Sequence, residues 1–320
     1  MKILFTGASS FTGSWFVKEL AARGHEVVAT FLRTEDAYQN IRATRVAQTK
    51  QWSTRVWSAP FGSKAFFDVV RSQERWDLLC HHASHVTDYK SPDFDPIRAL
   101  DLNTKGVPTL LKLLKEKQCN KLLITGSVFE QNEGRGDLPL HAFSPYGLSK
   151  GLMAEVFQYY AHVNKMQLGK FVIPNPFGPY EESRFTSFLI NSWYEGKTPH
   201  VATPAYVRDN IHVSLLAKAY AHFAERLTEQ EGIERDHPSG YVESQGDFTK
   251  RFAQEMRSRL SLDCSYTLAN QTEYSEPKTR HNTEALDTQL LGWDEKHSWD
   301  ELAHYYHHAF GKQKEHASAS

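Results

Sequence analysis

The sequence predicts an α/β fold in which helices cover both faces of a doubly wound parallel sheet, followed by a smaller C-terminal lobe. Short apolar runs alternate with segments long enough to form a helix, from residue 2 to about residue 174. A glycine-rich turn follows the first run directly, and the alternation is lost after Asn175. Strands that alternate with helical patterns are typical of βαβ units, whereas the irregular turns after residue 175 favour a separate lobe.

The first strand is expected in the apolar run 2–5. The helix after it is indicated by Trp15, Phe16 and Leu20, which recur at helical spacing, and Gly24 supplies its stop signal. Further buried strands are expected at residues 26–32, 54–58, 77–83, 121–125 and 170–174. Each gap between these strands is long enough for a crossover helix, which predicts parallel pairing.

Composition limits the classes of function. The chain has 320 residues, enough for two domains, and its formal net charge of -1 gives no electrostatic reason to expect nucleic acid or an anionic membrane as a partner. Cys80, Cys119 and Cys264 lack the spacing of a disulfide framework or a zinc ribbon. No stretch reaches the roughly 18 apolar residues of a membrane span. We therefore expect a cytoplasmic protein without a membrane anchor.

A phosphate-binding turn is indicated by TGASSFTG, residues 6–13. Gly7 allows unusual backbone angles, and Gly13 allows the following helix to lie close to the strand. The amides at the N-terminus of that helix face a pyrophosphate, with the helix dipole behind them. Ser10 stands where a third glycine is usual, and its small hydroxyl could donate to a phosphate oxygen. The turn therefore predicts a Rossmann-like dinucleotide site.

The end of the second strand indicates which dinucleotide is bound. NAD calls for an acidic residue there, about 20 residues after the turn, to bind the ribose. In TFLRTED, Arg33 precedes both acids, Glu35 and Asp36. A guanidinium matches the 2′-phosphate of NADP, which a carboxylate would repel. We expect NADP, with NAD as second choice. The alternative is that Arg33 is a solvated charge and that Glu35 or Asp36 binds the ribose.

The chemistry is indicated by SPYGLSK, residues 144–150. Tyr146 and Lys150 are four residues apart, a spacing that places both side chains on one face of a helix. An ammonium near a phenol lowers the tyrosine pKa, so that the tyrosine can exchange a proton near neutral pH. A bare YxxxK pattern also occurs by chance on surface helices, but here it follows the fifth expected strand of a chain with a glycine turn.

Six motifs in this order resemble those of the extended short-chain dehydrogenase/reductases, the family of nucleotide-sugar epimerases, dehydratases and 4-keto reductases. The similar pairs are TGxxGxxG with TGASSFTG, DVVIHxAA with DLLCHHAS (77–84), NxxGTxxLL with NTKGVPTLL (103–111), sPYxxSK with SPYGLSK, RxxNVYGP with IPNPFGPY (173–180) and RDxIxV with VRDNIHV (207–213). The resemblance covers nearly the whole chain.

The resemblance implies roles for individual residues. Tyr146 would be the general acid/base, and Lys150 its partner, which also bonds the nicotinamide ribose. The residues expected to bind the cofactor are Gly7, Ser10, Phe11, Thr12, Gly13, Arg33, His82, Ala83, Asn103, Tyr146, Lys150 and Pro174. Those expected to bind the substrate are Ser84, Asn175, Arg208 and Arg280. Arg208 would hold the diphosphate of a sugar nucleotide, while Arg280 either holds the nucleotide end or has only a surface role.

A catalytic serine or threonine is expected in LLITGSVFE (122–130). Alignment on the apolar strand selects Ser127, whereas alignment of VF with the family's VY selects Thr125, and either hydroxyl could bond to a substrate oxygen. The dehydratases of the family carry a Thr-Asp-Glu run here, and this chain has no such adjacent acids, which argues against a 4,6-dehydratase. Pro60 also stands where the family usually has an aspartate near the adenine.

The resemblance implies an NADP-dependent oxidoreductase or epimerase of a nucleotide-linked sugar, foremost a 4-keto sugar reductase or epimerase, with hydride transfer and Tyr146 as acid/base. One alternative is a regulatory protein that senses NAD(P) without turnover, and another is a carbonyl reductase of a non-nucleotide substrate. A sensor needs neither Tyr146 nor Lys150, so their presence favours the enzyme. The histidine clusters at 81–85 and 304–308 lack an acid or cysteine to complete a zinc site, so no metal is expected.

We expect a dinucleotide-binding domain at residues 1–175, to which 206–232 return, and a substrate-binding lobe made of 176–205 and 233–310. The polar tail 311–320 has no apolar periodicity and is expected to be disordered. The expected partners are a nucleotide-sugar substrate and a second copy of the chain in a homodimer, with no nucleic acid and no membrane.

Overall fold

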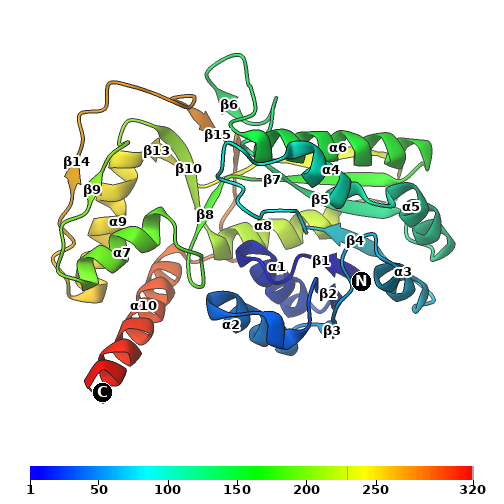
Figure 1. The fold of residues 1–320 in the computed structure, drawn as a ribbon, viewed down its shortest axis with the longest axis horizontal. Coiled ribbons are helices and arrows are strands. Elements are labelled where there is room, and N and C mark those ends of the chain that lie inside the picture. The colour runs from blue at the N-terminus through cyan, green and yellow to red at the C-terminus, as the bar shows by residue number, and fades with distance from the viewer. Residues whose placement is uncertain (229, 319–320) are drawn as a thin grey trace.

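A computed structural model of the chain describes residues 1–228 and 230–318. Its largest element is a seven-stranded parallel sheet with the order β11-β7-β5-β4-β1-β2-β3 (Figure 1). The strands are β1 (Lys2–Thr6), β2 (Glu26–Thr30), β3 (Thr54–Val56), β4 (Leu78–His81), β5 (Lys121–Ser127), β7 (Gln167–Ile173) and β11 (Gly232–Asp236). Each of the six predicted runs lies on one of these strands, and the predicted fold class is confirmed.

Helices cover both faces of the sheet, which is why side chains on both faces of its central strands are buried. In β1, Ile3 and Phe5 pack into the core on one face, and Leu4 packs into the core on the other. The first face is covered by α1 (Phe11–Ala22) and α8 (Val213–Arg226). The second is covered by α3 (Lys64–Arg71), α5 (Val107–Glu116) and α6 (Pro145–Val163). This two-sided core holds the strand ends in fixed positions.

The strand order reverses between β1 and β4, which lie side by side with Thr6 opposite His81. In doubly wound sheets, ligands bind outside the carboxyl ends of the strands at this point of reversal. The glycine turn that follows β1 and the carboxyl end of β5 both lie at this edge. The topology therefore brings the glycine turn TGASSFTG (6–13) to the same edge as SPYGLSK (144–150), which follows β5 in the chain.

The seventh strand, β11, was not expected from the sequence. It pairs with β7 from Gly232 to Asp236, so the sheet continues past residue 232, where the sequence placed the return to the small lobe. Its residues, GIERD, include only one buried side chain, that of Asp236. An edge strand pairs through its backbone, and β11 therefore carries no apolar run that a pattern search could detect.

Beyond the sheet, a three-stranded sheet β13-β10-β8 and three helices surround a separate apolar core, which includes Trp193, Phe248, Phe252 and Trp299 (left in Figure 1). Its elements are β8 (Asn175–Phe177), α7 (Phe185–Tyr194), β10 (Val207–His212), β13 (Tyr241–Ser244), α9 (Gln245–Leu260) and α10 (Glu295–Ser318). The remaining elements are η1 (Glu35–Ala37), α2 (Asn40–Gln48), η2 (Thr49–Gln51), α4 (Pro96–Thr104), and the paired strands β6 (Arg135–Gly136) with β15 (Arg280–His281), β9 (His200–Val201) with β14 (Thr267–Leu268), and β12 (Pro238–Ser239) with β16 (Glu284–Ala285).

The C-terminal tail differs from the prediction of disorder, because α10 continues as far as Ser318. Residues 319–320 lie outside the described residues. The first turns of α10 are anchored in the third core by Trp299, Leu302 and Tyr306. A helix that is already nucleated by packing extends easily through good helix formers such as the Lys, Gln, Glu and Ala of the tail. Within the described residues, no helix combines the length and the apolar character needed to cross a membrane.

Candidate active site

The glycine turn between β1 and α1 lies against the carboxyl end of β4. Gly7 has a φ of +88°, and a Cβ there would lie 2.6 Å from the backbone nitrogen of Ala83. A Cβ at Gly13 would lie 2.2 Å from the carbonyl oxygen of Gly7. Since neither contact is possible for a larger residue, both positions require glycine. The N-terminus of α1 is thereby held at the strand reversal, an arrangement that fits the pyrophosphate of a dinucleotide.

Ser10 closes this turn. Its hydroxyl donates to the carbonyl oxygen of Gly7 at 2.9 Å and accepts from the backbone N–H of Gly13 at 3.0 Å. Ser10 is therefore the N-cap of α1, and its proton is used inside the turn. This differs from the donation to a phosphate oxygen that the sequence suggested. The serine compensates for the missing third glycine by stabilising the same backbone geometry.

His82 connects the glycine turn with β5. Its Nε2 lies 3.0 Å from the hydroxyl of Thr12, and its Nδ1 lies 2.9 Å from the hydroxyl of Thr125. Burial, followed by the nearby charges of Lys150 and His81, lowers the pKa of His82 to about 3. The imidazole is therefore neutral, and it acts as a hydrogen-bonded bridge between the two parts of the site.

Asn103 holds the segment that follows β4. Its Oδ1 accepts from the backbone N–H of His85 at 2.7 Å, and its Nδ2 donates to the hydroxyl of Ser84 at 3.1 Å. Its carbonyl oxygen lies 3.2 Å from Nε2 of His81. Asn103 is buried, and it fixes the path of the chain through Ala83 and Ser84, two of the predicted site residues.

The residues after β2 leave an arginine exposed. β2 ends at Thr30, Phe31 is buried, and Arg33 is exposed. Glu35 forms an ion pair with Arg55 at 2.5 Å. Across residues 1–228 and 230–318, no ion pair involves the Arg33 guanidinium. One of the two acids considered for the ribose is thus engaged in an ion pair, while Asp36 and the predicted phosphate-binding Arg33 are both exposed.

The predicted pair Tyr146 and Lys150 lies in the first two turns of α6. Ser144 is the N-cap of this helix, and its hydroxyl accepts from the backbone N–H of Gly147 at 3.2 Å. Pro145 occupies the first helical position, where its missing N–H costs nothing. The cap and the proline fix where the helix begins, and therefore where Tyr146 stands relative to β5.

Lys150 is directed at β5, since its Nζ donates to the carbonyl oxygen of Thr125 at 2.5 Å. Burial lowers the pKa of Lys150 to about 8, although the charge of Glu130 acts in the opposite direction. The pKa of Tyr146 is raised, chiefly by burial and then by Glu130 and Tyr89. The prediction that Lys150 lowers the tyrosine pKa is therefore wrong for this arrangement, because burial outweighs any effect of an ammonium that is bonded to a backbone carbonyl.

Both candidate hydroxyls lie at the carboxyl end of β5. Thr125 is 3% exposed, and its hydroxyl is bonded to His82. Ser127 is the last residue of the strand and is half-buried, and its Oγ accepts from the backbone N–H of Phe129 at 3.2 Å. Side chains two apart on a strand share one face. The structure therefore places both on one face, with Ser127 closer to the end of the strand.

Arg208 lies in β10 between two aromatic rings. Its guanidinium carbon is 5.2 Å from the ring centroid of Phe143 and 4.4 Å from that of Tyr206. It donates to the carbonyl oxygen of Lys278 at 3.1 Å and forms an ion pair with Glu276, also at 3.1 Å. Stacking and hydrogen bonds hold the guanidinium in place, so its charge is presented at a fixed position.

Asn175 and Arg280, two more of the predicted substrate residues, have different surroundings. Asn175 begins β8 and lies opposite Asn210 of β10, so it stands next to the strand that carries Arg208. Arg280 is fully buried and donates to four backbone carbonyl oxygens, among them those of Glu133 at 2.9 Å and His141 at 2.8 Å. The surface role considered for Arg280 is therefore wrong, and its guanidinium fastens the loop between β5 and α6.

Comparison with known proteins agrees with this fold. The sequence model of the NAD dependent epimerase/dehydratase family matches residues 3–234, which is more than half of the chain. The chain belongs to this family. The matched region contains the glycine turn, Tyr146, Lys150, Asn175 and Arg208.

Individual relatives are distant in sequence and close in fold. A protein of Methanocaldococcus jannaschii, provisionally named a UDP-glucose 4-epimerase, is 23% identical over 228 residues, which are 68% of this chain and 71% of that protein. The UDP-glucose 4-epimerase of Thermotoga maritima, solved with UDP-glucose, is 15% identical, with a TM-score of 0.73 over 97% of this chain and 100% of its own. A mutant UDP-glucuronic acid 4-epimerase of Bacillus cereus, solved with UDP-4-deoxy-4-fluoro-glucuronic acid and NAD, is 16% identical, with the same TM-score and coverage.

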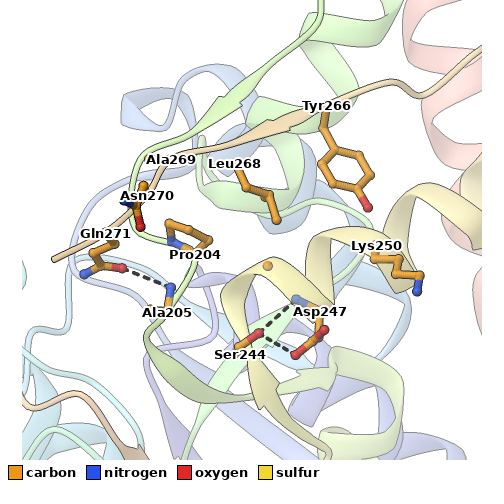
Figure 2. Close-up of a pocket in the computed structure, with 11 residues that line it drawn as sticks. Pro204, Ala205, Ser244, Asp247, Lys250, Tyr266, Leu268, Ala269, Asn270 and Gln271 are labelled. Atoms are coloured by element: carbon orange, nitrogen blue, oxygen red, sulfur yellow. Dashed lines mark hydrogen bonds between the residues drawn. The ribbon is translucent and has the colours of Figure 1, made fainter.

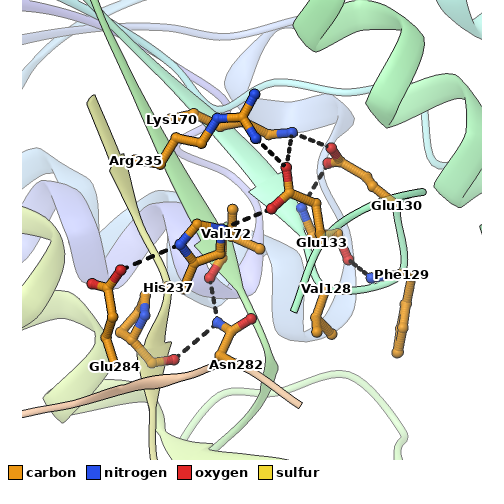
Figure 3. Close-up of polar contacts among 12 residues, drawn as sticks. Val128, Phe129, Glu130, Glu133, Lys170, Val172, Arg235, His237, Asn282 and Glu284 are labelled. Carbon is orange, nitrogen blue, oxygen red and sulfur yellow. Dashed lines mark hydrogen bonds and ion pairs between the residues drawn. The ribbon is translucent and has the colours of Figure 1, made fainter. Parts of the chain in front are cut away.

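Several residues around the epimerase-family site were not found from the sequence. Glu130, Glu133 and Lys170 form buried ion pairs next to the end of β5 (Figure 3). A signal was present, because Lys170 interrupts the apolar run of β7 and a buried ammonium requires a carboxylate partner. The rings of Tyr89 and Phe94 also pack edge-on against Tyr146, at centroid distances of 5.2 and 6.1 Å, and no motif indicated them.

The histidine clusters are engaged in hydrogen bonds. Nδ1 of His81 lies 2.9 Å from the hydroxyl of Thr6, and Nε2 of His307 lies 2.9 Å from the carbonyl oxygen of Arg259. In the part of the chain that the structure describes, no group of three His, Cys, Asp or Glu side chains is arranged to hold a metal ion. The homodimer and the cytoplasmic location stay predictions.

A separate surface pocket of about 330 Å³ lies in the smaller lobe at the start of α9 (Figure 2). Its lining includes Ser244, Asp247, Lys250, Tyr266 and Gln271, and it contains none of the predicted site residues. Ser244 caps α9 by accepting from the backbone N–H of Asp247 at 3.0 Å. Ser244 and Asp247 thus serve the helix terminus, while Gln271 accepts from the backbone N–H of Ala205 at 3.0 Å.

Proposed function

We propose that the protein transfers a hydride to and from a carbon of a nucleotide-linked sugar, with NADP as cofactor, as a 4-keto sugar reductase or a 4-epimerase. The observation that carries this proposal is the position of Tyr146 and Lys150 one turn apart at the start of α6, with Lys150 bonded to the carboxyl end of β5. In this proposal the phenol of Tyr146, the ammonium of Lys150 and the hydroxyl of Ser127 act together at the edge of the sheet where the glycine turn lies.

The cofactor would be held by the glycine turn, the first turn of α1 and Arg33. When bound, its nicotinamide supplies the carbon that exchanges the hydride with the sugar. The exposed guanidinium of Arg33 supports NADP, because it can meet the 2′-phosphate with a charge-assisted contact. The ion pair between Glu35 and Arg55 supports the same preference, since it engages one of the two acids considered for the ribose.

Tyr146 would exchange a proton with the oxygen of the reacting sugar carbon. Its raised pKa keeps the phenol protonated at neutral pH, a state suited to protonating the oxygen of a keto sugar as it is reduced. Lys150, with its pKa at about 8, remains mostly charged at pH 7 and would stabilise the phenolate that results. We assign the orienting hydroxyl to Ser127, because the hydroxyl of Thr125 is already bonded to His82.

Arg208 and Asn175 would contact the diphosphate-linked sugar. A diphosphate that leaves water requires compensating charge, and a guanidinium held between two rings can supply it. Relatives solved with UDP-glucose or with a UDP-glucuronic acid analogue support a nucleotide sugar as the substrate class. In this assignment the carboxylate of Glu276 leaves Arg208 when the diphosphate binds.

The test uses two assays with the purified protein. In the first, NADPH oxidation is followed with a panel of 4-keto nucleotide sugars, and substrate-dependent oxidation identifies a reductase. In the second, interconversion of UDP-glucose and UDP-galactose is followed without net change of cofactor, and conversion identifies an epimerase. If neither occurs, and calorimetry detects no binding of a nucleoside diphosphate, the proposal is wrong and a carbonyl reductase of a non-nucleotide substrate becomes the better description.

A further inference from the structure

A fully buried carboxylate stands directly behind the end of β5. Glu130, three residues after Ser127, is 0% exposed. Its Oε1 accepts from the backbone N–H of Ser127 at 2.7 Å, and its Oε2 accepts from Nζ of Lys170 at 2.6 Å (Figure 3). The carboxylate therefore fixes the last peptide of β5, the strand that carries the hydroxyl proposed to orient the substrate.

The partner of Glu130 is itself part of a longer chain of charges. Lys170 is shared between Glu130 and Glu133, each at 2.6 Å. Glu133 also bonds to Nε2 of His237 at 2.7 Å, and Nδ1 of His237 lies 3.3 Å from the partly exposed Glu284. The chain thus runs from the end of β5 to the surface, and Lys170 is held from both sides.

Gly126 lets the side chains of Lys170 and Glu130 lie close to β5. A Cβ at Gly126 would lie 2.7 Å from Cε of Lys170 and 3.1 Å from Oε1 of Glu130. The residue before it, Thr125, accepts from Lys150 through its carbonyl oxygen at 2.5 Å. The ammonium of Lys150 and the carboxylate of Glu130 therefore attach to backbone groups only two residues apart on β5.

Burying the ion pair between Glu130 and Lys170 costs folding free energy, which raises the question of what the pair contributes. Moving a carboxylate and an ammonium out of water is expensive, and an apolar pair of similar volume is often as stable or more stable. The pair lies behind the proposed catalytic groups, where a charge would act on them with little screening by solvent. A role in the chemistry accounts for its position.

We infer that Glu130 is a positioning residue of the proposed catalytic centre, which holds Ser127 at the end of β5 and places a fixed negative charge beside Lys150 and Tyr146. Lys170 keeps that charge in place through its bond to Glu130. The inference rests on the proposed function for its meaning, while the arrangement of Glu130, Lys170 and Lys150 can be tested without turnover.

The expected effect on protonation follows from the charges around each group. Lys150 is affected by Glu130 and Lys170 in addition to burial. Tyr146 is affected by burial, then Glu130, Tyr89 and Arg184. A negative charge on Glu130 raises the pKa of both Lys150 and Tyr146, and it therefore favours the ammonium form of Lys150 and the neutral phenol of Tyr146.

The neighbours of Glu130 complete this set. The pKa of Glu130 is raised overall, chiefly by burial, although Lys170 and Lys150 lower it and Glu133 raises it further. His237, whose pKa is raised, bears on this set only through Glu133. Two ammonium groups and one carboxylate thus face Glu130, and its own charge is favoured by its closest partners.

The test compares Glu130→Gln with Glu133→Gln. Both variants remove one carboxylate from Lys170, but only Glu130 contacts Ser127. Loss of the Glu130 charge should lower the pKa of Lys150 from about 8 by about 1 pH unit. The measurement is an NMR titration of lysine labelled at Cε, with the signal assigned by Lys150→Arg and with neither substrate nor cofactor present.

In turnover assays, Glu130→Gln should move both limbs of the pH profile to lower pH, while Glu133→Gln leaves them in place and lowers only thermal stability. Glu130→Asp keeps the charge but is one methylene shorter, so it should reduce kcat by about tenfold with the limbs nearly unchanged. If Glu130→Gln does not fold, Glu130→Asp and Glu133→Gln still decide the question through the Lys150 titration and kcat.

The inference is overturned if Lys150 titrates alike in the wild type and Glu130→Gln. It is also overturned if Glu133→Gln changes the Lys150 titration equally, or if Glu130→Asp has the kcat of the wild type. A wild-type protein without turnover on any nucleotide sugar would contradict the proposed function, but the Lys150 titration would still decide the role of Glu130.

Discussion

Arg208 is paired with Glu276 at 3.1 Å, on a segment that also binds Tyr206. The backbone N–H groups of Ser275 and Glu276 donate to the Tyr206 hydroxyl at 2.9 and 3.2 Å, and the carbonyl oxygen of Lys278 accepts from Arg208. Residues 275–278 are therefore fastened across the arginine that we assign to the diphosphate. Glu276 is half exposed, so its hold on Arg208 is weak enough to be exchanged for a phosphate.

Glu276→Gln should bind UDP more tightly than the wild type, because the competing carboxylate is removed. An exposed ion pair contributes about 0.2–1 kcal/mol, so the gain should be about 1.4- to fivefold in Kd. Arg208→Ala should weaken UDP binding and leave NADPH affinity nearly unchanged. Calorimetry measures both, with Glu273→Gln, an exposed acid of the same segment, as the control. Equal UDP affinity in all four proteins would place the diphosphate elsewhere.

Tyr146→Phe should retain the fold and cofactor binding and lose activity. The ring keeps its contacts with Tyr89 and Phe94, while the oxygen that exchanges the proton is removed. Loss of general acid/base catalysis typically lowers rates by about 10² to 10⁴-fold. Tyr89→Phe is the matched control, since it removes a neighbouring hydroxyl from the same aromatic cluster. Activity near that of the wild type in Tyr146→Phe would move the proton transfer to another group.

Arg33→Ala should weaken NADPH binding selectively. A charge-assisted contact to the 2′-phosphate is worth about 1.5–3 kcal/mol, which predicts a loss of about 10- to 100-fold in NADPH affinity and little change for NADH. Fluorescence titration of both cofactors measures this, with Arg71→Ala of α3 as a control for charge alone. If the wild type binds NADH more tightly than NADPH, the proposal of NADP as cofactor is wrong.

Two adjacent acids should have opposite effects on stability as the pH changes. Burial raises the pKa of Glu181 to about 7, and its Oε2 lacks a hydrogen-bond partner among the described residues. The native state therefore favours the protonated form, whose contribution is complete below pH 4.5 and is lost as the pH rises through 7. Glu181→Gln should be more stable than the wild type by about 1–3 kcal/mol at pH 8, with no gain at pH 4.

Glu182 provides the control for that measurement. Burial opposes its ionisation, but the ion pair with Arg45 lowers its pKa overall. Its contribution to stability is therefore present above its unfolded pKa and is lost at acid pH. Glu182→Gln should be less stable than the wild type at pH 8, and the difference should shrink toward pH 4. Urea unfolding at pH 4 and pH 8 measures the free energy of unfolding of both variants. If both variants changed stability in the same direction at pH 8, the pKa directions assigned to Glu181 and Glu182 would be contradicted.

The sequence by itself determined the parallel sheet, the glycine turn and the pair Tyr146 and Lys150. The apolar runs of β1, β2, β4, β5 and β7 are local signals, since a strand buried on both faces is mostly apolar. The spacing of Tyr146 and Lys150 is also local, because helix geometry alone puts residues four apart on one face. The edge strand β11 had no such signal, and it was missed.

Tertiary structure decided the partners of these groups. Lys170 and Glu130 are 40 residues apart in the chain, Glu133 and His237 are 104 apart, and Arg208 and Glu276 are 68 apart. A charge in the sequence indicates that a partner is needed once it is buried, but it does not indicate which one. That choice depends on which segments the sheet and its crossovers bring together. For the same reason, burial and the direction of Lys150 decided the tyrosine pKa, although the spacing of Tyr146 and Lys150 had predicted the opposite shift.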